Sequence, residues 1–125
     1  MCYNVGMNRN GFEKFIVENY NVGPEYLWVK YPTIAVFRHK ENKKWFAVVM
    51  TINKKKLGIE QNSEIDVVNL KCESVGMFSL VQQNGIFPAY HMNKNHWISV
   101  CLDNSVDEQM IKVLLDISYN LTNTK

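Results

Sequence analysis

The chain has 125 residues, of which 46% are hydrophobic and 12% aromatic, and it carries a formal net charge of +2 at pH 7. This length suits one domain with a single core, and the composition excludes a disordered chain. No apolar run approaches the roughly 18 residues that span a bilayer, and the opening MCYNVGMNRNGF lacks the basic start and apolar centre of a signal peptide. We expect one cytoplasmic domain over residues 1–125 with no membrane partner; the oligomeric state stays open, with a monomer favoured.

A short amphipathic helix is predicted over residues 10–20, NGFEKFIVENY. Its apolar residues have the i, i+3, i+4 and i+8 spacing that places them on one helical face: Phe12, Phe15, Ile16 and Tyr20. The following NVGPEYLWVKYPT contains one glycine and two prolines, so we expect it to be irregular. Its aromatic residues are expected to cover the core: Tyr26, Trp28 and Tyr31.

Two apolar runs then predict a β-hairpin. They are IAVFRH and KWFAVVMTI, and they are joined by KENK, with Glu41 and Asn42 near the turn. Alternation along the second strand predicts one face made of Phe46, Val48, Met50 and Ile52, and another made of Trp45, Ala47, Val49 and Thr51. Both sets are mainly apolar, so we expect this strand to be central and covered on both sides. The next stretch, NKKKLGIEQNSE, is expected to be a polar, flexible loop.

The second half of the chain predicts two further strands and two helices. The strands are IDVVNLKC and WISVCLD, the second of which contains Cys101 as an expected core residue. ESVGMFSLVQQNG predicts a short helix that ends at Gly85. SVDEQMIKVLLDISYNL predicts a helix with a capping box formed by Ser105 and Glu108. Its apolar stripe is expected to consist of Val106, Met110, Val113, Leu114, Ile117 and Leu121.

This order of elements predicts an α+β fold in which helices pack on one face of an antiparallel β-sheet. The chain has three cysteines, which are Cys2, Cys72 and Cys101. Their odd number excludes a complete disulfide framework, and the lack of C-x-x-C spacing gives no sign of a zinc ribbon. We expect Cys2, near the terminus, to be exposed.

The densest group of potential site residues is PAYHMNKNHW, residues 88–97. Its two histidines, His91 and His96, are five residues apart, whereas H-E-x-x-H zinc helices need a spacing of four, and Lys94 between them would oppose a cation. The chain has no G-x-S-x-G nucleophile elbow, no serine or cysteine whose context couples it to a histidine, and no glycine-rich phosphate loop. We therefore expect no metal, no cofactor and no enzymatic activity.

Positive charge is concentrated in the middle of the sequence. Residues 30–56 contain eight basic residues and one acid, whereas residues 57–125 contain eight acids and four lysines. Two interpretations stay open, because the basic residues could form a face for an anionic partner or could protect exposed hairpins and edge strands from aggregation. On the first interpretation, the candidate phosphate contacts form three groups. The hairpin tip supplies Arg38, Lys40, Lys43 and Lys44, with His39 also at its base. The following loop supplies Lys54, Lys55 and Lys56, and the 88–97 stretch supplies His91, Lys94 and His96.

Five stretches of the sequence resemble the MmcQ/YjbR family of small bacterial proteins. They are KWFAVV at residues 44–49, VVNLKC at 67–72, FPAYHMNKNHWISV at 87–100, LDNSV at 102–106 and LLDISYNL at 114–121. The resemblance covers nearly the whole chain, from Asn8 to Leu121, and residues 88–97 are its most specific part. It implies a compact α+β fold similar to the frataxin/CyaY-like arrangement, also described as a double-wing DNA-binding motif.

Family members are commonly labelled DNA-binding, largely because of this fold. Our first functional expectation is therefore a non-enzymatic regulatory protein that docks basic β-wings on double-stranded DNA. The alternative is a protein- or small-ligand-binding domain with a pocket around Tyr90, His91, His96 and Trp97. The frataxin comparison also suggests iron chemistry, which in frataxins depends on an acidic first helix. That helix here offers only Glu13 and Glu18 beside two basic residues, so we do not expect iron handling.

Overall fold

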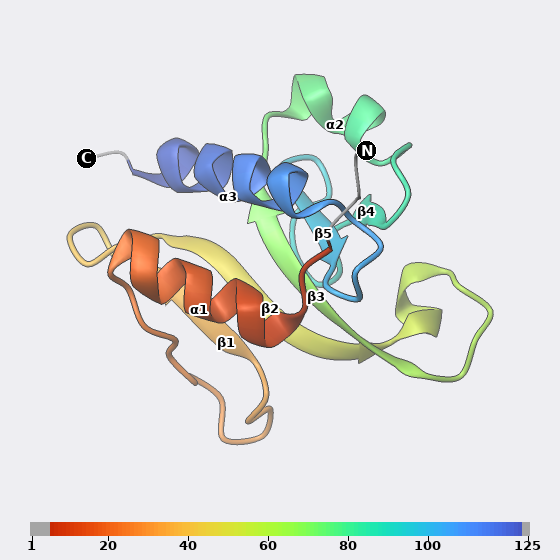
Figure 1. The fold of residues 1–125 in the computed structure, drawn as a ribbon, viewed down its shortest axis with the longest axis horizontal. Helices are drawn as coiled ribbons and strands as arrows, with labels where there is room; N and C mark the ends of the chain where they lie inside the picture. Colours follow the sequence, from red (N-terminus) through yellow and green to blue (C-terminus); the bar gives the residue numbers. More distant parts are fainter. Residues whose placement is uncertain (1–5, 124–125) are drawn as a thin grey trace.

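The computed structural model describes residues 6–123, which form a five-stranded antiparallel sheet with helices on one face (Figure 1). Cys2 lies outside the described residues. The elements in chain order are α1 (Arg9–Tyr20), β1 (Ala35–Arg38), β2 (Trp45–Asn53), the short 3₁₀ helix η1 (Lys54–Leu57), β3 (Glu64–Lys71), α2 (Ser74–Leu80), β4 (Ile86–Pro88), β5 (Trp97–Cys101) and α3 (Glu108–Thr122). The predicted α+β class and sheet are confirmed. No helix within residues 6–123 has both the length and the apolar character needed to cross a bilayer.

The strand order is β1-β2-β3-β5-β4, and every pairing is antiparallel. The β1–β2 hairpin is confirmed, and β2 is buried along most of its length, as predicted for a strand covered on both sides. Strand β4 was not predicted, because it has only three residues and contains Pro88. Proline is tolerated here because β4 lies at the edge of the sheet, where one row of backbone donors has no partner strand.

A β-bulge in the hairpin changes which side chains of β2 share a face. Arg38 pairs with Trp45 and Phe37 with Ala47, which leaves Phe46 as an extra residue between the two pairs. Phe46 consequently packs in the helix-side core with Ala47 and Val49. Trp45 instead joins the opposite face, which carries Val48, Met50 and Ile52. The predicted face assignment of Trp45 and Phe46 is therefore wrong.

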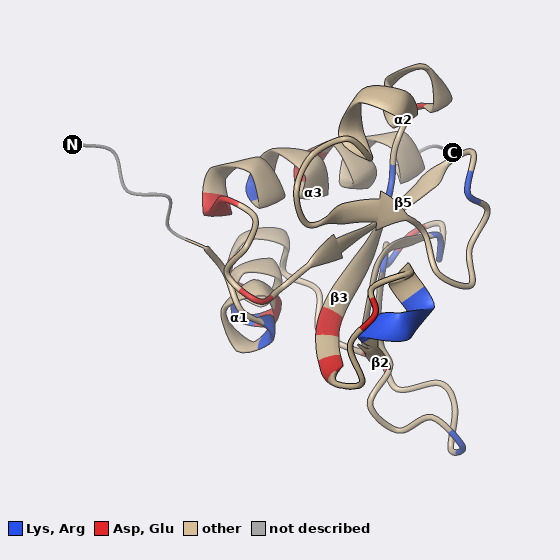
Figure 2. Ribbon diagram, turned by 90° about the vertical axis from the view of Figure 1, so that its right-hand side faces the viewer, with Lys and Arg blue, Asp and Glu red and all other residues tan. Residues whose placement is uncertain are grey.

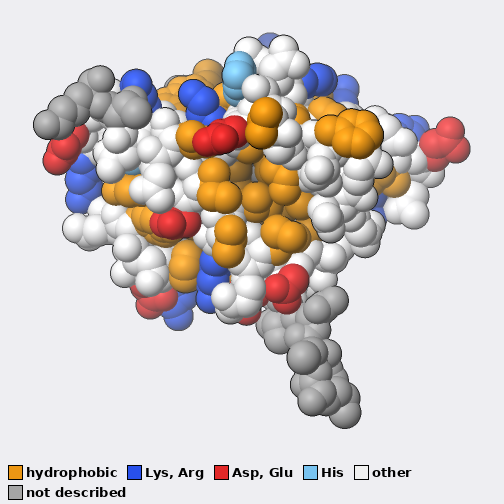
Figure 3. Space-filling view, turned by 90° about the horizontal axis from the view of Figure 1, so that it is seen from above, with side chains coloured by type: hydrophobic (Ala, Val, Ile, Leu, Met, Phe, Trp, Pro, Cys, Tyr) orange, Lys and Arg blue, Asp and Glu red, His pale blue; other side chains and the backbone are white. Residues whose placement is uncertain are grey.

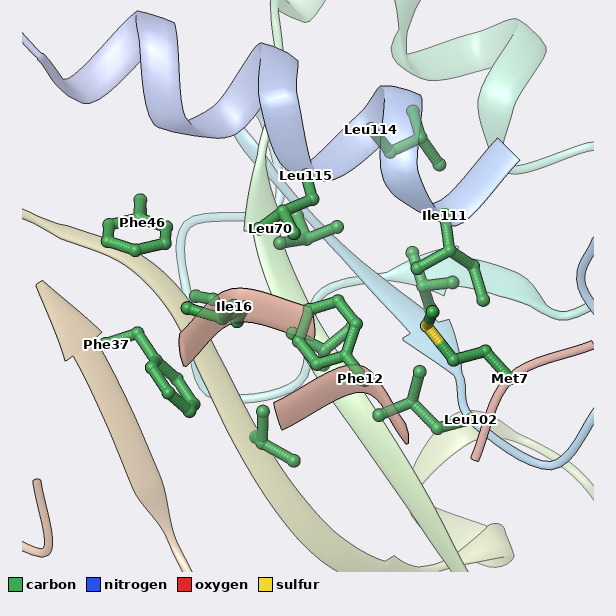
Figure 4. Packing of buried hydrophobic residues seen from close by; sticks show 14 of the residues in the cluster. Met7, Phe12, Ile16, Phe37, Phe46, Leu70, Leu102, Ile111, Leu114 and Leu115 are labelled. Carbon is green, nitrogen blue, oxygen red and sulfur yellow. The ribbon is translucent and has the colours of Figure 1, made fainter. Parts of the chain in front are cut away.

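The helix-side core is formed by α1 and α3 packing against the strands (Figure 4). The predicted apolar face of α1 is confirmed, since Phe12 and Ile16 are fully buried and Phe15 and Tyr20 are partly buried against them. Helix α1 begins after Asn8, whose side chain accepts a hydrogen bond from the Gly11 N–H at 2.8 Å.

Helix α3 is rotated relative to its predicted orientation. Its buried residues are Ile111, Leu114, Leu115, Ser118 and Thr122, whereas the predicted core residues Val113 and Ile117 are 55% and 40% exposed. Val75 and Phe78 of α2 are exposed as well. Figure 3 shows apolar side chains gathered on the face of the molecule that is seen from above.

Helix α3 is rotated because two of its polar residues, Ser118 and Thr122, are buried and hydrogen-bonded. Ser118 Oγ donates to Phe46 O at 2.6 Å and accepts from the Lys71 N–H at 2.8 Å, so an apolar stripe alone misplaces the buried face.

The predicted capping box is also wrong. The residue that caps α3 is Asp107, whose carboxylate accepts a hydrogen bond from the Gln109 N–H at 3.1 Å. Ser105 instead donates to Asp103 in the preceding loop. Helix α2 likewise ends at Leu80, five residues before the predicted Gly85, and Gly85 adopts a positive φ of 85° just before β4.

The sheet face opposite α1 and α3, here called the open face, has a second apolar cluster. It consists of Val36, Val48, Met50, Ile52, Ile65, Val67 and Cys101, so the predicted burial of Cys101 is confirmed. Figure 2 shows α1 and α3 on one side of the strands and η1, in blue, on the other. The stretch predicted as a flexible loop thus begins with a 3₁₀ turn, which the Asn53 side chain caps by accepting from the Lys55 N–H.

Candidate functional site

A cavity of about 490 Å³ lies on the open face, above β2. Its floor is made by alternate residues of that strand: Val48, Met50 and Ile52. One wall is the irregular segment before β1, which supplies Trp28, Tyr31, Thr33 and Ile34. The opposite wall is the start of the loop between β4 and β5, with Tyr90, His91 and Met92. Residues far apart in the sequence therefore form one pocket, which we call the open-face pocket.

The expectation that the aromatic residues before β1 cover the core is wrong. Tyr26, Trp28 and Tyr31 are all exposed, and the last two line the open-face pocket. Trp28 meets Trp45 edge to face, with ring centroids 5.7 Å apart and an interplanar angle of 87°. The bulge that moves Trp45 to the open face thus creates this pair of tryptophans at the start of β2.

Two buried polar residues hold the Tyr90 wall in place. Ser99 Oγ accepts a hydrogen bond from the Tyr90 N–H at 3.0 Å, and Asn69 Nδ2 donates to Tyr90 O at 2.8 Å. Ser99 Oγ also donates to Asn69 Oδ1 at 2.5 Å, so the pair fixes both backbone groups of Tyr90. Asn69 and Ser99 face each other on β3 and β5 and are fully buried. They are visible in the sequence as uncharged polar residues within the mainly apolar runs VVNLKC and WISVC, a signal that a choice of charged and catalytic residue types overlooks.

The loop itself is tied down by further contacts. Lys94 Nζ donates to Ala89 O at 2.8 Å, and this bond closes the turn before β5. His91 has a φ of 62° and contacts the Tyr90 ring, with the ring centroids 3.8 Å apart. The His96 N–H donates to Asn93 O at 3.1 Å within the same turn.

The structure therefore places only some of the predicted pocket residues in the open-face pocket. Tyr90 and His91 line the open-face pocket, whereas His96 and Trp97 do not. Among residues 6–123, no group of three histidine, cysteine, aspartate or glutamate side chains is placed to hold a metal ion.

The far end of the pocket is polar and positively charged. Asn53 and Lys56 line it where β2 passes into η1. The side chain of Lys56 forms no hydrogen bond or ion pair with any of the described residues. The pocket lining, all of it within residues 6–123, includes no aspartate or glutamate.

The two lysine groups predicted to contact DNA lie at opposite ends of β2. Lys40, Lys43 and Lys44 belong to the turn before this nine-residue strand, and Lys54–Lys56 follow it. Nine extended residues span about 30 Å, so the strand separates the two groups by a large part of the molecule. Figure 2 likewise shows lysine and arginine on separate parts of the ribbon.

Several of the predicted phosphate contacts, among them Arg38, Lys54 and Lys94, already have partners in the protein. Arg38 forms two hydrogen bonds to the Glu25 carboxylate, at 2.7 and 2.8 Å, and they hold the pKa of Glu25 below its usual range. Lys94 is bonded to Ala89 O, and Lys54 Nζ donates to Gln61 Oε1 at 3.0 Å. The other predicted contacts are exposed: Lys40, Lys43, Lys44, Lys55, Lys56, His91 and His96.

His39, at the base of the hairpin turn, is buried beneath the end of α3. Its Nε2 lies 2.8 Å from Thr122 Oγ1, and its ring contacts Phe46 and Tyr119. Asn42 Nδ2 donates to Thr122 O at 2.9 Å, which also ties the turn to α3. Burial lowers the pKa of His39, so this histidine is a structural contact and not a surface cation.

Comparison with known proteins agrees with this fold. The family model described as YjbR matches residues 18–121. The chain is 40% identical to the uncharacterised protein YyaQ of Bacillus subtilis over 116 residues, covering 93% of this chain and 98% of YyaQ. It is also similar to a crystal structure from Pseudomonas syringae, with 41% identity and a TM-score of 0.92 over 94% of this chain and 100% of that one. A Deinococcus radiodurans protein, at 23% identity, shares the fold with a TM-score of 0.71 over 95% of this chain and 80% of its own.

Proposed function

The chain belongs to the YjbR family, and we propose that it is a binding protein that holds a small organic molecule in the open-face pocket. The observation that carries this proposal is a cavity of about 490 Å³ with an apolar floor and aromatic walls. Pockets of roughly 300–1,000 Å³, mainly apolar and with a few polar groups, are typical of small-molecule sites.

The fixed position of the Tyr90 wall supports the same proposal. Both backbone groups of Tyr90 are bonded to the buried pair Asn69 and Ser99, so this wall has its shape before a ligand arrives. A preformed wall reduces the conformational entropy that binding must overcome.

The proposed activity is binding without catalysis. Cys72 and Cys101, the cysteines within the described residues, are both buried. Burial raises the pKa of the Cys101 thiol to about 12, so this thiol stays protonated at neutral pH and is a poor nucleophile.

A neutral aromatic amide, 4-(2-naphthyl)butanamide, provides a direct test. In ¹⁵N-labelled protein we expect it to shift the indole N–H signals of Trp28 and Trp45, which contact each other at the pocket. The indole signal of Trp97 is the internal control, because Trp97 does not line the pocket. We also expect Trp45→Ala to weaken binding about tenfold, the loss of one aromatic contact. Absence of any shift with the amide and with its charged analogues at millimolar concentration would refute the proposal.

Double-stranded DNA is a second candidate, favoured by one specific observation. Lys55 and Lys56 are both exposed on η1, whose short helical turn presents three successive lysines at one end of the molecule. Such a group could contact phosphates, although its distance from Lys40, Lys43 and Lys44 gives no single band of charge.

The DNA proposal predicts a steep salt dependence. Duplex affinity should fall with added salt. Replacing Lys54–Lys56 with glutamine should make the plot of log affinity against log salt concentration less steep, by the amount expected for the loss of about two to three phosphate contacts. A variant of Lys40, Lys43 and Lys44 is the matched control, with three lysines changed at the opposite end of β2. Undetectable duplex binding in low salt would exclude this candidate.

A further inference from the structure

We infer that the open-face pocket takes an elongated organic anion, with a flat aromatic ring at its tryptophan end and a carboxylate or phosphate group at Lys56. The inference rests on the proposed function and adds the chemical class of the ligand. Three features of the pocket support it: its direction along β2, the shape of its aromatic end and the sign of the charge at its other end.

The pocket has two chemically different ends. Trp45 is the first residue of β2, Asn53 is the last, and Lys56 follows in η1. The floor between them is apolar, because strand alternation places Val48, Met50 and Ile52 on the same face, and the bulge adds Trp45 to it. A ligand lying along the strand would therefore meet tryptophan at one end and an amide and an ammonium group at the other.

The tryptophan end suits a flat ring. Trp28 and Trp45 meet edge to face at 87°, and Tyr90 and His91 form the opposite wall. Aromatic rings interact favourably in edge-to-face and offset arrangements, and planar rings lose little conformational entropy on binding. An aromatic group thus gains specific contacts here that a branched aliphatic group of equal area does not.

The charge of the lining selects an anion over a cation. A set of tryptophan and tyrosine rings can also bind quaternary ammonium ions, usually by cation–π contacts. In this pocket, however, no carboxylate lines the wall, and the ammonium group of Lys56 has no partner among the described residues. Lys30 adds a second positive charge, with its Nζ 5.9 Å from the ring centroid of the lining residue Tyr31. Both lysines would repel a cation and attract an anion.

The test compares three ligands that share the same naphthyl ring. They are 4-(2-naphthyl)butanoate, the neutral 4-(2-naphthyl)butanamide and a trimethylammonium analogue, and their dissociation constants are measured by calorimetry at low salt. We expect the carboxylate to bind about fivefold tighter than the amide, a ratio typical of one partly exposed charge contact, and the cation to bind weakest.

Variants of two neighbouring lysines assign the effect to one side chain. Lys56→Gln should remove most of the preference for the carboxylate, so that this variant binds the acid and the amide with nearly equal dissociation constants. Lys55→Gln is the matched control, because Lys55 carries the same charge on the same 3₁₀ turn but does not line the pocket. Its preference should equal that of the unchanged protein.

The outcomes separate this inference from the proposed function. Equal binding of acid and amide, tightest binding of the cation, or equal effects of Lys55→Gln and Lys56→Gln would overturn the anion assignment and leave the binding function intact. Failure of all three ligands to bind would instead overturn the proposed function itself.

Discussion

At the scale of single residues, two buried polar groups connect the fold to the candidate site. Asn69 and Ser99 are opposite each other in the middle of the sheet, and together they satisfy the backbone N–H and C=O of Tyr90. Burial of such polar groups is tolerated only when they are hydrogen-bonded. No described side chain leaves a buried nitrogen or oxygen without a partner, so this small network is complete.

Removing Asn69 should therefore affect both stability and the pocket. We expect Asn69→Ala to lower the free energy of unfolding by about 2 kcal/mol, because Tyr90 O and Ser99 lose their buried partner. Urea denaturation measures this change, and Asn84→Ala, at an exposed loop position, should change stability by less than about 0.5 kcal/mol. Equal stability of the two variants would show that the network does not hold the loop.

The burial of His39 should make the stability of the protein depend on pH. Its side chain is buried against Phe46 and Tyr119, and burial lowers its pKa below the value of about 6.5 expected in the unfolded chain. Between the folded and unfolded pKa values the unfolded state binds more protons, so stability rises with pH in this range. The contribution of neutral His39 to the free energy of unfolding is complete above pH 6.5. It is lost as the pH falls from 6.5 toward the pKa of His39 in the folded protein.

Urea denaturation at several pH values between 5 and 8 measures this effect. His39→Gln should reduce the loss of stability on acidification, because glutamine does not titrate. Asn84→Ala is the control, since Asn84 is exposed, does not titrate and should leave the pH dependence unchanged. An unchanged pH dependence in His39→Gln would contradict the prediction.

At the scale of elements, periodicity predicted most helices and strands but not the details that build the pocket. A period of two cannot reveal the extra residue in β2, so it placed Trp45 on the wrong face. Strand β4 is too short to have a recognisable pattern. The choice of lysines and histidines as site residues followed side-chain type alone, whereas the open-face pocket depends on aromatic residues brought together by three separate segments.

The orientation of α3 allows the predicted and observed faces to be compared directly. Ile111 was absent from the predicted stripe and is fully buried, whereas Val113 was included in it and is exposed. We expect Ile111→Ala to cost about 2–5 kcal/mol of stability and Val113→Ala less than about 0.5 kcal/mol. Thermal or urea unfolding of the two variants measures both values. A larger loss for Val113→Ala would restore the orientation predicted from the sequence.

At the scale of the whole molecule, the open-face pocket joins parts of the chain that are far apart in the sequence. The segment before β1, strand β2 with η1, and the loop before β5 each contribute a wall, a floor or an end. A ligand that touches all three stabilises the folded state by mass action and also links segments that lie on the side of the sheet without long helices.

This arrangement predicts where a ligand should protect the protein. With 4-(2-naphthyl)butanoate at 100 times its dissociation constant, we expect the free energy of unfolding to rise by about 2.7 kcal/mol. Hydrogen exchange should slow most in residues 28–34 and 90–92, which form the two walls, because local opening of these segments releases the ligand. Residues 74–80 of α2 are the internal control, since they lie outside the pocket and should exchange at the same rate with and without ligand. A tenfold weaker affinity leaves about 1.4 kcal/mol of stabilisation in Trp45→Ala at the same ligand concentration. Slower exchange confined to α2, or undiminished stabilisation in Trp45→Ala, would place the ligand elsewhere on the molecule.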